Sequence, residues 1–171
     1  MKTAWISETG PTPFGPMWVA VTEDGLAAVQ WEMSQDDFSR QLERRGYQPV
    51  IYDAERAGPA ARQVCEYLDS KRQAFELPID WESMRPFQQR VLQATLAIPF
   101  GSSSTYAELA RQVGRPGAAR AVGRAEATNP MPLVIPCHRV LGSDGKLHGY
   151  GGPGGIGMKA WLLKLEGREG Y

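Results

Sequence analysis

One stretch organises this chain: Asn129-Pro130-Met131-Pro132-Leu133-Val134-Ile135-Pro136-Cys137-His138-Arg139-Val140. The apolar run at residues 133–135 predicts a buried strand. Pro136 lacks a backbone donor and fixes its own φ, so we expect the strand to end there in a stiff turn. Cys137 then lies at the edge of a buried element, beside His138 and Arg139, where a base or a cation can favour the reactive thiolate. Taken alone, Cys-His-Arg is a short motif that is equally compatible with an unreactive core cysteine.

The composition is that of an ordinary folded protein. The chain has 171 residues, of which 42% are hydrophobic and 22% charged, enough for one large domain or two small ones. Its start lacks the apolar segment of a signal peptide, and no apolar stretch is long enough to span a bilayer. We therefore expect a cytoplasmic protein that does not contact membranes. In that compartment Cys65 and Cys137 should stay reduced, and Cys65 lies in the apolar stripe of a predicted helix, where packing is its simplest role.

The net charge of zero hides an asymmetry between the two halves. Residues 85–171 contain 11 Lys/Arg and 5 Asp/Glu, whereas residues 1–84 contain the other 8 Lys/Arg and 14 Asp/Glu. The second half therefore has a charge of +6 and the first half −6. This opposition predicts that only the second half faces a polyanion. A chance distribution of surface charge is the alternative.

Residues 1–84 are predicted to form a small α/β domain with an antiparallel sheet. Strands are expected at residues 4–6, 17–21, 26–31, 48–52 and 75–79, with a hairpin turn at 23–25. Ser34 should cap a helix that ends near Gly46, and Gly58-Pro59 should introduce a second helix. No catalytic pattern is evident in this half. We place the domain boundary between residues 84 and 85, where the composition changes.

Residues 85–171 are predicted to form a mostly helical domain with a winged-helix-like helix-turn-helix. Helices are expected at residues 86–98, 106–113, 118–127 and 158–166. Pro86 begins the first helix and Pro99 stops it, while Thr105 and Glu108 form a capping box before the second. Two short helices joined by a turn that contains Gly114 are typical of a helix-turn-helix.

The second helix of this pair is rich in alanine, and only Arg120 and Arg124 project far from it. It has few of the Asn, Gln, Arg or Ser side chains that read base edges in the major groove. A thin helix can instead approach the narrow minor groove, where recognition is almost independent of sequence. Tight packing against a neighbouring helix would also explain the alanines, and both can hold on different faces.

A glycine-rich segment follows at residues 147–155. It lacks the Lys-Ser/Thr pair of a phosphate-binding loop and the spacing of a dinucleotide fingerprint, so we exclude nucleotide binding. Glycines beside a reactive turn instead allow backbone N–H groups to approach a substrate closely.

Together these motifs resemble the O6-alkylguanine-DNA alkyltransferases, the methylated-DNA–protein-cysteine methyltransferases. The resemblance covers nearly all of residues 86–167 in the family's order, whereas the first half resembles the family's N-terminal α/β domain only in layout. The motifs are Pro86-Phe87-Gln88-Gln89, Ile98-Pro99-Phe100-Gly101, Thr105-Tyr106-Ala107-Glu108-Leu109-Ala110, Ala119-Arg120-Ala121-Val122-Gly123, Asn129-Pro130, Pro136-Cys137-His138-Arg139-Val140, Gly149-Tyr150-Gly151-Gly152, Trp161-Leu162-Leu163 and Leu165-Glu166-Gly167.

The resemblance implies DNA repair by direct transfer of an alkyl group. An O6-alkylguanine, with O4-alkylthymine as a further candidate, would be lifted out of the duplex through the minor groove, and Cys137 would accept the alkyl group once and irreversibly. His138 would take the thiol proton through a water, and Glu166 would orient the imidazole. Tyr106 would donate a proton to the guanine ring. No cofactor is implied.

The resemblance also implies contacts with substrate and DNA. Substrate contacts are expected from Cys137, Val140, Tyr150, Gly151, Asn129 and Pro132. DNA contacts are expected from Arg120, Ala119, Ala121, Gly123, Tyr106 and Thr105. Among these, Arg120 would fill the stack that the everted base vacates. The implied partner is alkylated double-stranded DNA, bound without sequence preference by a monomer, with cooperative assembly on DNA left open.

Two departures from the family matter. Some relatives hold a structural zinc ion in the N-terminal domain, but residues 1–84 contain no His and only Cys65. Zinc sites need three or four such ligands, so we predict no metal. The loop at residues 151–157 is also slightly longer than the family's, which predicts an altered tolerance for bulky adducts.

Three rival functions remain open. A thiol hydrolase would use Cys137 and His138, but the base of such enzymes normally comes from a distant segment. A helix-turn-helix regulator would need more base-reading side chains than the alanine-rich helix offers. A lesion-binding relative without transfer activity would lack the nucleophile, which is present here.

Overall fold

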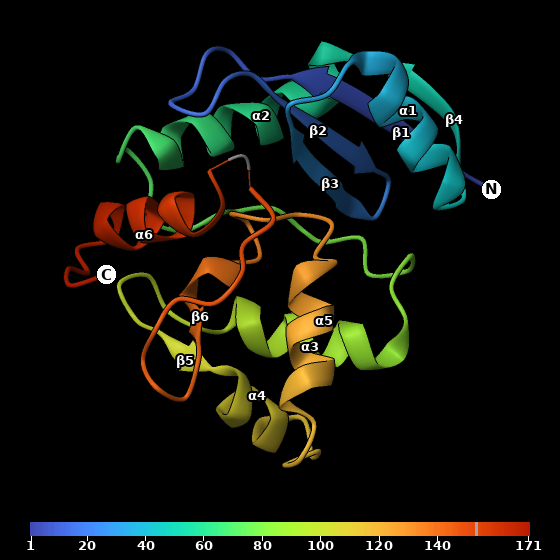
Figure 1. Ribbon diagram of the computed structural model, residues 1–171. Helices are drawn as coiled ribbons and strands as arrows, with labels where there is room; N and C mark the ends of the chain where they lie inside the picture. Colours follow the sequence, from blue (N-terminus) through green and yellow to red (C-terminus); the bar gives the residue numbers. More distant parts are fainter. Residues whose placement is uncertain (153) are drawn as a thin grey trace. The chain divides into compact units, whose positions relative to one another are not determined.

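The computed structural model describes residues 1–152 and 154–171 (Figure 1). It divides into two compact units, Met1–Ser83 and Met84–Tyr171. Within the described residues, no helix is both long and apolar enough to cross a membrane.

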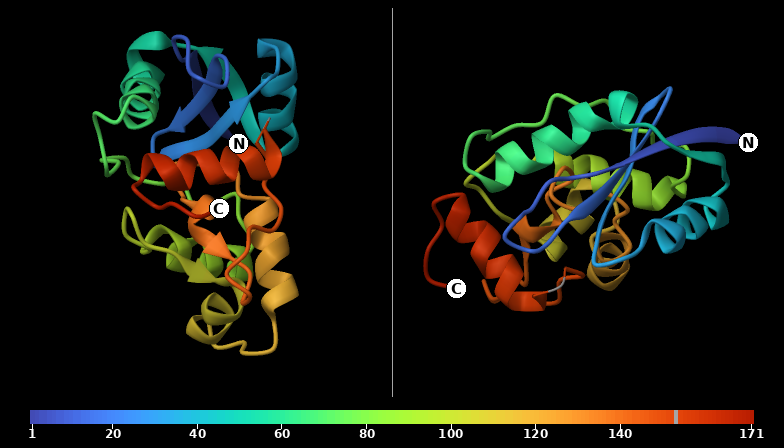
Figure 2. Two further views of the ribbon diagram at one scale, coloured as in Figure 1. Left: turned by 60° about the vertical axis from the view of Figure 1, so that its left-hand side comes forward. Right: turned by 90° about the horizontal axis from the view of Figure 1, so that it is seen from above.

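A four-stranded sheet forms the centre of the first unit. Its strands are β1 (Lys2–Glu8), β2 (Met17–Thr22), β3 (Gly25–Trp31) and β4 (Tyr47–Tyr52), in the order β3-β2-β1-β4. The helices α1 (Gln35–Arg44) and α2 (Ala54–Leu68) lie on opposite sides of this sheet (Figure 2). Because both faces are covered, β2 and β3 are buried almost throughout. On the α1 side, Phe38 and Leu42 pack against Ile6, Trp18 and other buried strand residues.

The prediction of an antiparallel sheet is correct for β1, β2 and β3 but wrong for β4. β1 pairs antiparallel with β2, and β2 with β3, whereas β4 pairs parallel with β1. The reason is the connection through α1. A helical crossover carries the chain from β3 to the far edge of the sheet, so β4 runs in the same direction as β1.

The first unit corrects two further predictions. Helix α2 begins at Ala54 and not at Gly58-Pro59, because the Asp53 carboxylate accepts hydrogen bonds from the N–H groups of Glu55 and Arg56 and caps the helix earlier. Pro59 therefore lies inside the helix.

The strand expected at residues 75–79 is also absent, apart from one isolated bridge between Leu26 and Ile79. The Gln63 side chain bonds both backbone groups of Glu76, at 2.9 Å to its N–H and 3.3 Å to its carbonyl. These two groups therefore pair with a side chain, where a sheet would pair them with a neighbouring strand.

The second unit packs short helices around a small apolar core. Its elements are α3 (Pro86–Leu96), β5 (Ser104–Thr105), α4 (Tyr106–Gln112), α5 (Ala119–Ala127), the 3₁₀ turn η1 (Cys137–Arg139), β6 (Val140–Leu141) and α6 (Gly155–Leu165). Val91, Leu109 and Val122 join α3, α4 and α5 in this core. The predicted helix-turn-helix is α4 and α5 (Figure 1). The parallel pair β5–β6 connects the start of α4 to the chain just after Cys137.

The predicted capping box before α4 forms in one direction only. The Thr105 hydroxyl accepts a hydrogen bond from the Glu108 N–H, as expected. The Glu108 carboxylate, however, accepts from the Ser104 hydroxyl at 3.2 Å. α6 also begins earlier than predicted, at Gly155.

The strand predicted at residues 133–135 is wrong, although all three residues are buried as expected. Leu133 adopts a φ of +74°, which is incompatible with a strand, and the Ile135 N–H donates to the Met131 carbonyl in a tight turn. Asn129 stabilises this turn from the end of α5. Its amide accepts from the Met131 N–H at 3.0 Å and donates to the Ile135 carbonyl at 2.9 Å. The segment that leads to Cys137 is thus a compact turn fastened to the helix-turn-helix.

Candidate active site

Cys137 lines a cavity of about 760 Å³ in the second unit. Cys137 is only 8% exposed and is the first residue of the 3₁₀ turn η1. This volume lies within the range of small-molecule pockets, about 300–1,000 Å³. The other lining residues come from α4, from one face of α5 and from the loop after β6: Tyr106, Ala107, Ala119, Arg120, Gly123, Glu126, Ala127, Gly142, Ser143, Asp144, His148, Gly149, Tyr150 and Gly151.

A network of buried charged and polar groups surrounds the side chain next to Cys137. His138 is 0% exposed, and its Nε2 lies 2.9 Å from Glu166 Oε1. Arg139 donates from Nε and Nη2 to the same carboxylate, at 2.9 Å to Oε2 and 2.7 Å to Oε1, and from Nη1 to the Ile98 carbonyl. The Gly101 N–H adds a further bond to Glu166. Such fork-shaped, charge-assisted pairing fixes the carboxylate and, through it, the imidazole.

This network sets the protonation of the pair His138 and Glu166. Burial alone would raise the pKa of Glu166, but hydrogen bonds from His138 and Arg139 lower it to about 2, so the carboxylate is ionised. Burial lowers the pKa of His138 and outweighs the opposing effect of Glu166. The resting imidazole is therefore neutral. An Nε2–H that donates to Glu166 makes Nδ1 the basic nitrogen, an assignment that follows from the hydrogen-bond network.

The thiol of Cys137 is protonated in the free protein. Burial, followed by the charge of Glu126, raises its pKa to about 12, although the Asn129 amide and the Lys159 ammonium act in the opposite direction. Arg139 does not face the sulfur, because its guanidinium is committed to Glu166 and Ile98. Any reaction at this sulfur would therefore need a base to take the proton.

Tyr106 lies at the start of α4 with its hydroxyl on the cavity wall. The hydroxyl donates to the His148 carbonyl at 3.3 Å, and Lys159 Nζ donates to the same carbonyl at 2.9 Å and to the Tyr106 oxygen at 3.4 Å. Burial, with a contribution from Glu126, raises the pKa of Tyr106 to about 12. Tyr106 is therefore a protonated phenol beside a cation, an arrangement that can donate a proton and stabilise the phenolate that results.

The structure gathers only part of the predicted set around the cavity. Cys137, Tyr106, Tyr150 and Gly151 line it, together with Arg120, Ala119 and Gly123 from α5. His138 and Glu166 are buried behind the turn that bears Cys137. Among the described residues, the cavity lining does not include Thr105, Ala121, Asn129, Pro132 or Val140. Asn129 stabilises the turn before Cys137 and also interacts with the thiol itself, and Val140 is buried in β6.

The sequence did not predict the roles of three residues of the site: Arg139, Lys159 and Glu126. Arg139 was expected only as a cation beside the thiol, whereas its guanidinium pairs with Glu166 and Ile98. Lys159 is 0% exposed in α6. Its position three residues before the apolar Leu162 places it on the buried face of the helix, and this spacing could have indicated a buried lysine. Glu126 is the acidic residue of the otherwise small and basic α5.

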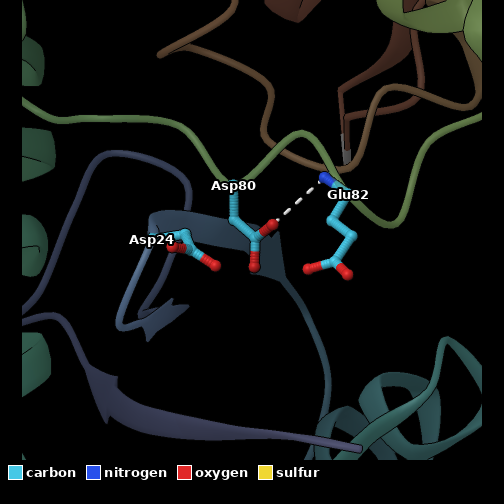
Figure 3. Close-up of side chains that lie close together, drawn as sticks. All are labelled: Asp24, Asp80 and Glu82. Atoms are coloured by element: carbon cyan, nitrogen blue, oxygen red, sulfur yellow. Dashed lines mark hydrogen bonds between the residues drawn. The ribbon is translucent and has the colours of Figure 1, made fainter.

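The first unit contains three carboxylates whose oxygens lie within 4.8 Å of one another, on Asp24, Asp80 and Glu82 (Figure 3). Lys2 Nζ forms ion pairs with all three carboxylates, at 2.5 Å from Asp24 and 3.2 Å from Asp80, and with Glu82 as well. We call these four residues the Lys2 cluster. The ammonium stands between the carboxylates where a metal ion would have to bind, so the cluster supplies its own cation.

Two family models match the chain. The DNA binding domain of 6-O-methylguanine DNA methyltransferase matches residues 86–168, and the ribonuclease-like domain of the same family matches residues 6–81. A methylated-DNA–protein-cysteine methyltransferase of Salmonella typhimurium is 40% identical over 167 residues, which cover 95% of each chain. The chain belongs to the 6-O-methylguanine DNA methyltransferase family.

Further members of this family agree with that assignment. The constitutive methylated-DNA–protein-cysteine methyltransferase of Bacillus subtilis is 37% identical over 161 residues, covering 92% of this chain and 93% of the relative. The crystal structure of a Mycobacterium tuberculosis O6-methylguanine methyltransferase superposes with a TM-score of 0.76 at 34% identity and covers 97% of this chain and 93% of that one. A structure of Mycobacterium tuberculosis OGT in complex with DNA gives a TM-score of 0.75 at 36% identity, covering 96% and 92%.

Proposed function

We propose that this protein repairs DNA by moving the alkyl group of O6-alkylguanine, and of O4-alkylthymine where it fits, onto Sγ of Cys137. One observation supports the proposal above all. Cys137 lines a cavity that opens beside the second helix of a helix-turn-helix, and a buried acid–base network lies directly behind the cysteine. The repair relatives share nearly the whole length of the chain. The protein would act in the cytoplasm.

Binding to DNA would use α5. Ala119, Gly123 and Ala127 keep the cavity face of this helix thin, so it can approach the minor groove closely. The positive charge of residues 85–171 would neutralise phosphates without regard to sequence. The base must leave the stack for its O6 substituent to reach a buried sulfur, and a damaged base costs less to extract. Exposed Arg120, at the rim of the cavity, would then occupy the gap in the duplex.

The chemistry begins with loss of the thiol proton. The basic Nδ1 of His138 would take it through a water, and the ionised Glu166, held by Arg139, would stabilise the imidazolium. Sγ then attacks the alkyl carbon in line with O6, and the C–O6 bond breaks as the S–C bond forms. The electron pair moves into the guanine ring.

A proton from Tyr106 would neutralise the departing base, and Lys159 would stabilise the phenolate. The proton that leaves Cys137 is thus held by His138, and the proton that the base gains comes from Tyr106. The product is a thioether, and none of the described residues that line the cavity can hydrolyse its C–S bond, so each molecule should react once.

Intact mass after incubation with duplex DNA that contains O6-methylguanine tests the proposal. The wild type should gain the mass of one methyl group, and Cys65→Ser should do the same. Cys137→Ser should gain nothing. A wild-type protein that keeps its mass in excess alkylated DNA, with Cys137 still open to a thiol reagent, would refute the transfer.

A further inference from the structure

The reaction proposed above leaves one buried acid of the cavity without a task. Glu126 is 6% exposed and lies on the cavity face of α5, in the same lining as Cys137. Its Oε1 accepts a hydrogen bond from the Thr95 hydroxyl on α3. Its Oε2 is inaccessible to solvent and has no hydrogen-bond partner among the described residues. Leaving a buried carboxyl oxygen unpaired is costly, which points to a partner that arrives later.

The position of Glu126 relates this oxygen to the reacting sulfur. Both residues line one cavity, and the charge of Glu126, second to burial, raises the pKa of Cys137. In the proposed reaction the first carbon of the adduct must lie in contact with Sγ. Any further atoms of a larger adduct extend from that carbon into the cavity whose wall includes Glu126.

Glu126 can meet a hydroxyl group in either protonation state. Burial raises the pKa of Glu126 to about 7, although the Thr95 hydroxyl and Lys159 oppose this effect. An ionised carboxylate accepts from a hydroxyl, and a neutral carboxyl group can both accept and donate. An apolar chain of the same size would leave Oε2 unpaired.

We propose that Glu126 is a specificity-determining residue: its carboxyl group rotates when an adduct enters, which turns Oε2 from its buried position towards the cavity and pairs it with a hydroxyl on the O6 substituent, so that the cavity prefers hydroxyalkyl adducts to apolar adducts of equal size. This inference rests on the proposed alkyl transfer. The preferred substrates would be neutral adducts of the 2-hydroxyethyl type. The propyl adduct, which has the same number of heavy atoms, is the apolar reference.

Single-turnover transfer rates on duplexes with O6-(2-hydroxyethyl)guanine, O6-propylguanine and O6-methylguanine test the proposal. In the wild type the hydroxyethyl adduct should react about tenfold faster than the propyl adduct, the factor expected from one hydrogen bond in a buried site. Glu126→Met should abolish or reverse this ratio, because it replaces the carboxyl group with an apolar chain. Glu126→Gln should keep part of it, since the amide retains an acceptor.

Two controls separate recognition from structure. Glu108→Gln removes an exposed acid of α4 and should leave the ratio unchanged. Thr95→Val removes the partner of Oε1 and should alter stability more than the ratio, because Oε2 is still present.

Three outcomes would overturn the inference. These are equal wild-type rates on the hydroxyethyl and propyl adducts, an unchanged ratio in Glu126→Met, and an equal loss of rate on all three adducts in Glu126→Met with the ratio preserved. In each of them methyl transfer by the wild type would still stand. Absence of methyl transfer in the wild type would instead remove the proposed function itself.

Discussion

Replacing Glu166 with Gln should destabilise the second unit by about 3 kcal/mol at neutral pH. A carboxyl group whose pKa falls from 4.5 to about 2 on folding contributes about that much stability. The substitution also leaves the guanidinium of Arg139, which is 7% exposed, without its counter-charge. Breaking a buried ion pair by removing one partner typically costs about 3–5 kcal/mol, so the two arguments agree.

The pH dependence has a definite sign. The folded pKa of Glu166 is depressed, so its stabilising contribution is complete above pH 4.5 and is lost as the pH falls towards 2. The difference in stability between wild type and Glu166→Gln should therefore shrink from about 3 kcal/mol at pH 7 to about 1 kcal/mol at pH 3.

Urea unfolding of the wild type, Glu166→Gln and the control Glu169→Gln, at both pH values, measures this difference. Glu169 is exposed, so its substitution should change stability little. Hydrogen exchange in α6 would assign the loss to the second unit. A difference below about 1 kcal/mol at pH 7, or one that stays constant on acidification, would refute the role of the buried pair.

Four other results are expected. Tyr106→Phe should slow methyl transfer by about a hundredfold in a single-turnover assay, far more than it weakens binding to DNA, because it removes the proposed proton donor; a normal rate would exclude that role. Arg120→Ala should reduce extrusion of the lesion, followed with a fluorescent base analogue beside it, more than it weakens binding to undamaged duplex; equal losses would favour a simple phosphate contact. Lys2→Met should lower stability by about 2 kcal/mol, since it leaves the carboxylates of the Lys2 cluster facing one another, whereas exposed Lys71→Met should be neutral in the same urea titration. Cys137 in the free protein should react with iodoacetamide far more slowly at pH 8 than a small thiol does, because its pKa is about 12, and peptide mapping would detect the opposite result.

The parts of the fold that the sequence predicted depend on local signals. The hairpin around residues 23–25, the Ser34 cap and the helix-turn-helix each arise from turn and capping residues a few positions apart. The parallel pairing of β4 could not be predicted in this way, because it depends on where α1 returns the chain. The turn at Leu133 was missed because an apolar run has the same composition whether it is extended or folded back, and the amide of Asn129 decides between them.

The site shows the same division between local and distant signals. The motif Pro-Cys-His-Arg predicted Cys137 as the nucleophile, and the family resemblance predicted Glu166 as the partner of His138, which it contacts in the structure. The sequence could not show that Arg139 pairs with Glu166, 27 residues away, nor that Glu126 on α5 and Lys159 on α6 interact behind the cavity wall. Such roles are set by tertiary packing, which brings charges from separate helices into one dry space.

The ammonium of Lys159 links two parts of the chain that line the cavity. It donates hydrogen bonds to the His148 carbonyl, in the glycine-rich loop, and to the Tyr106 hydroxyl, at the start of α4. The Tyr106 hydroxyl also donates to this carbonyl, so two hydrogen bonds fix its position. Lys159, which is inaccessible to water, thereby holds the backbone at His148 in a fixed position beside the cavity.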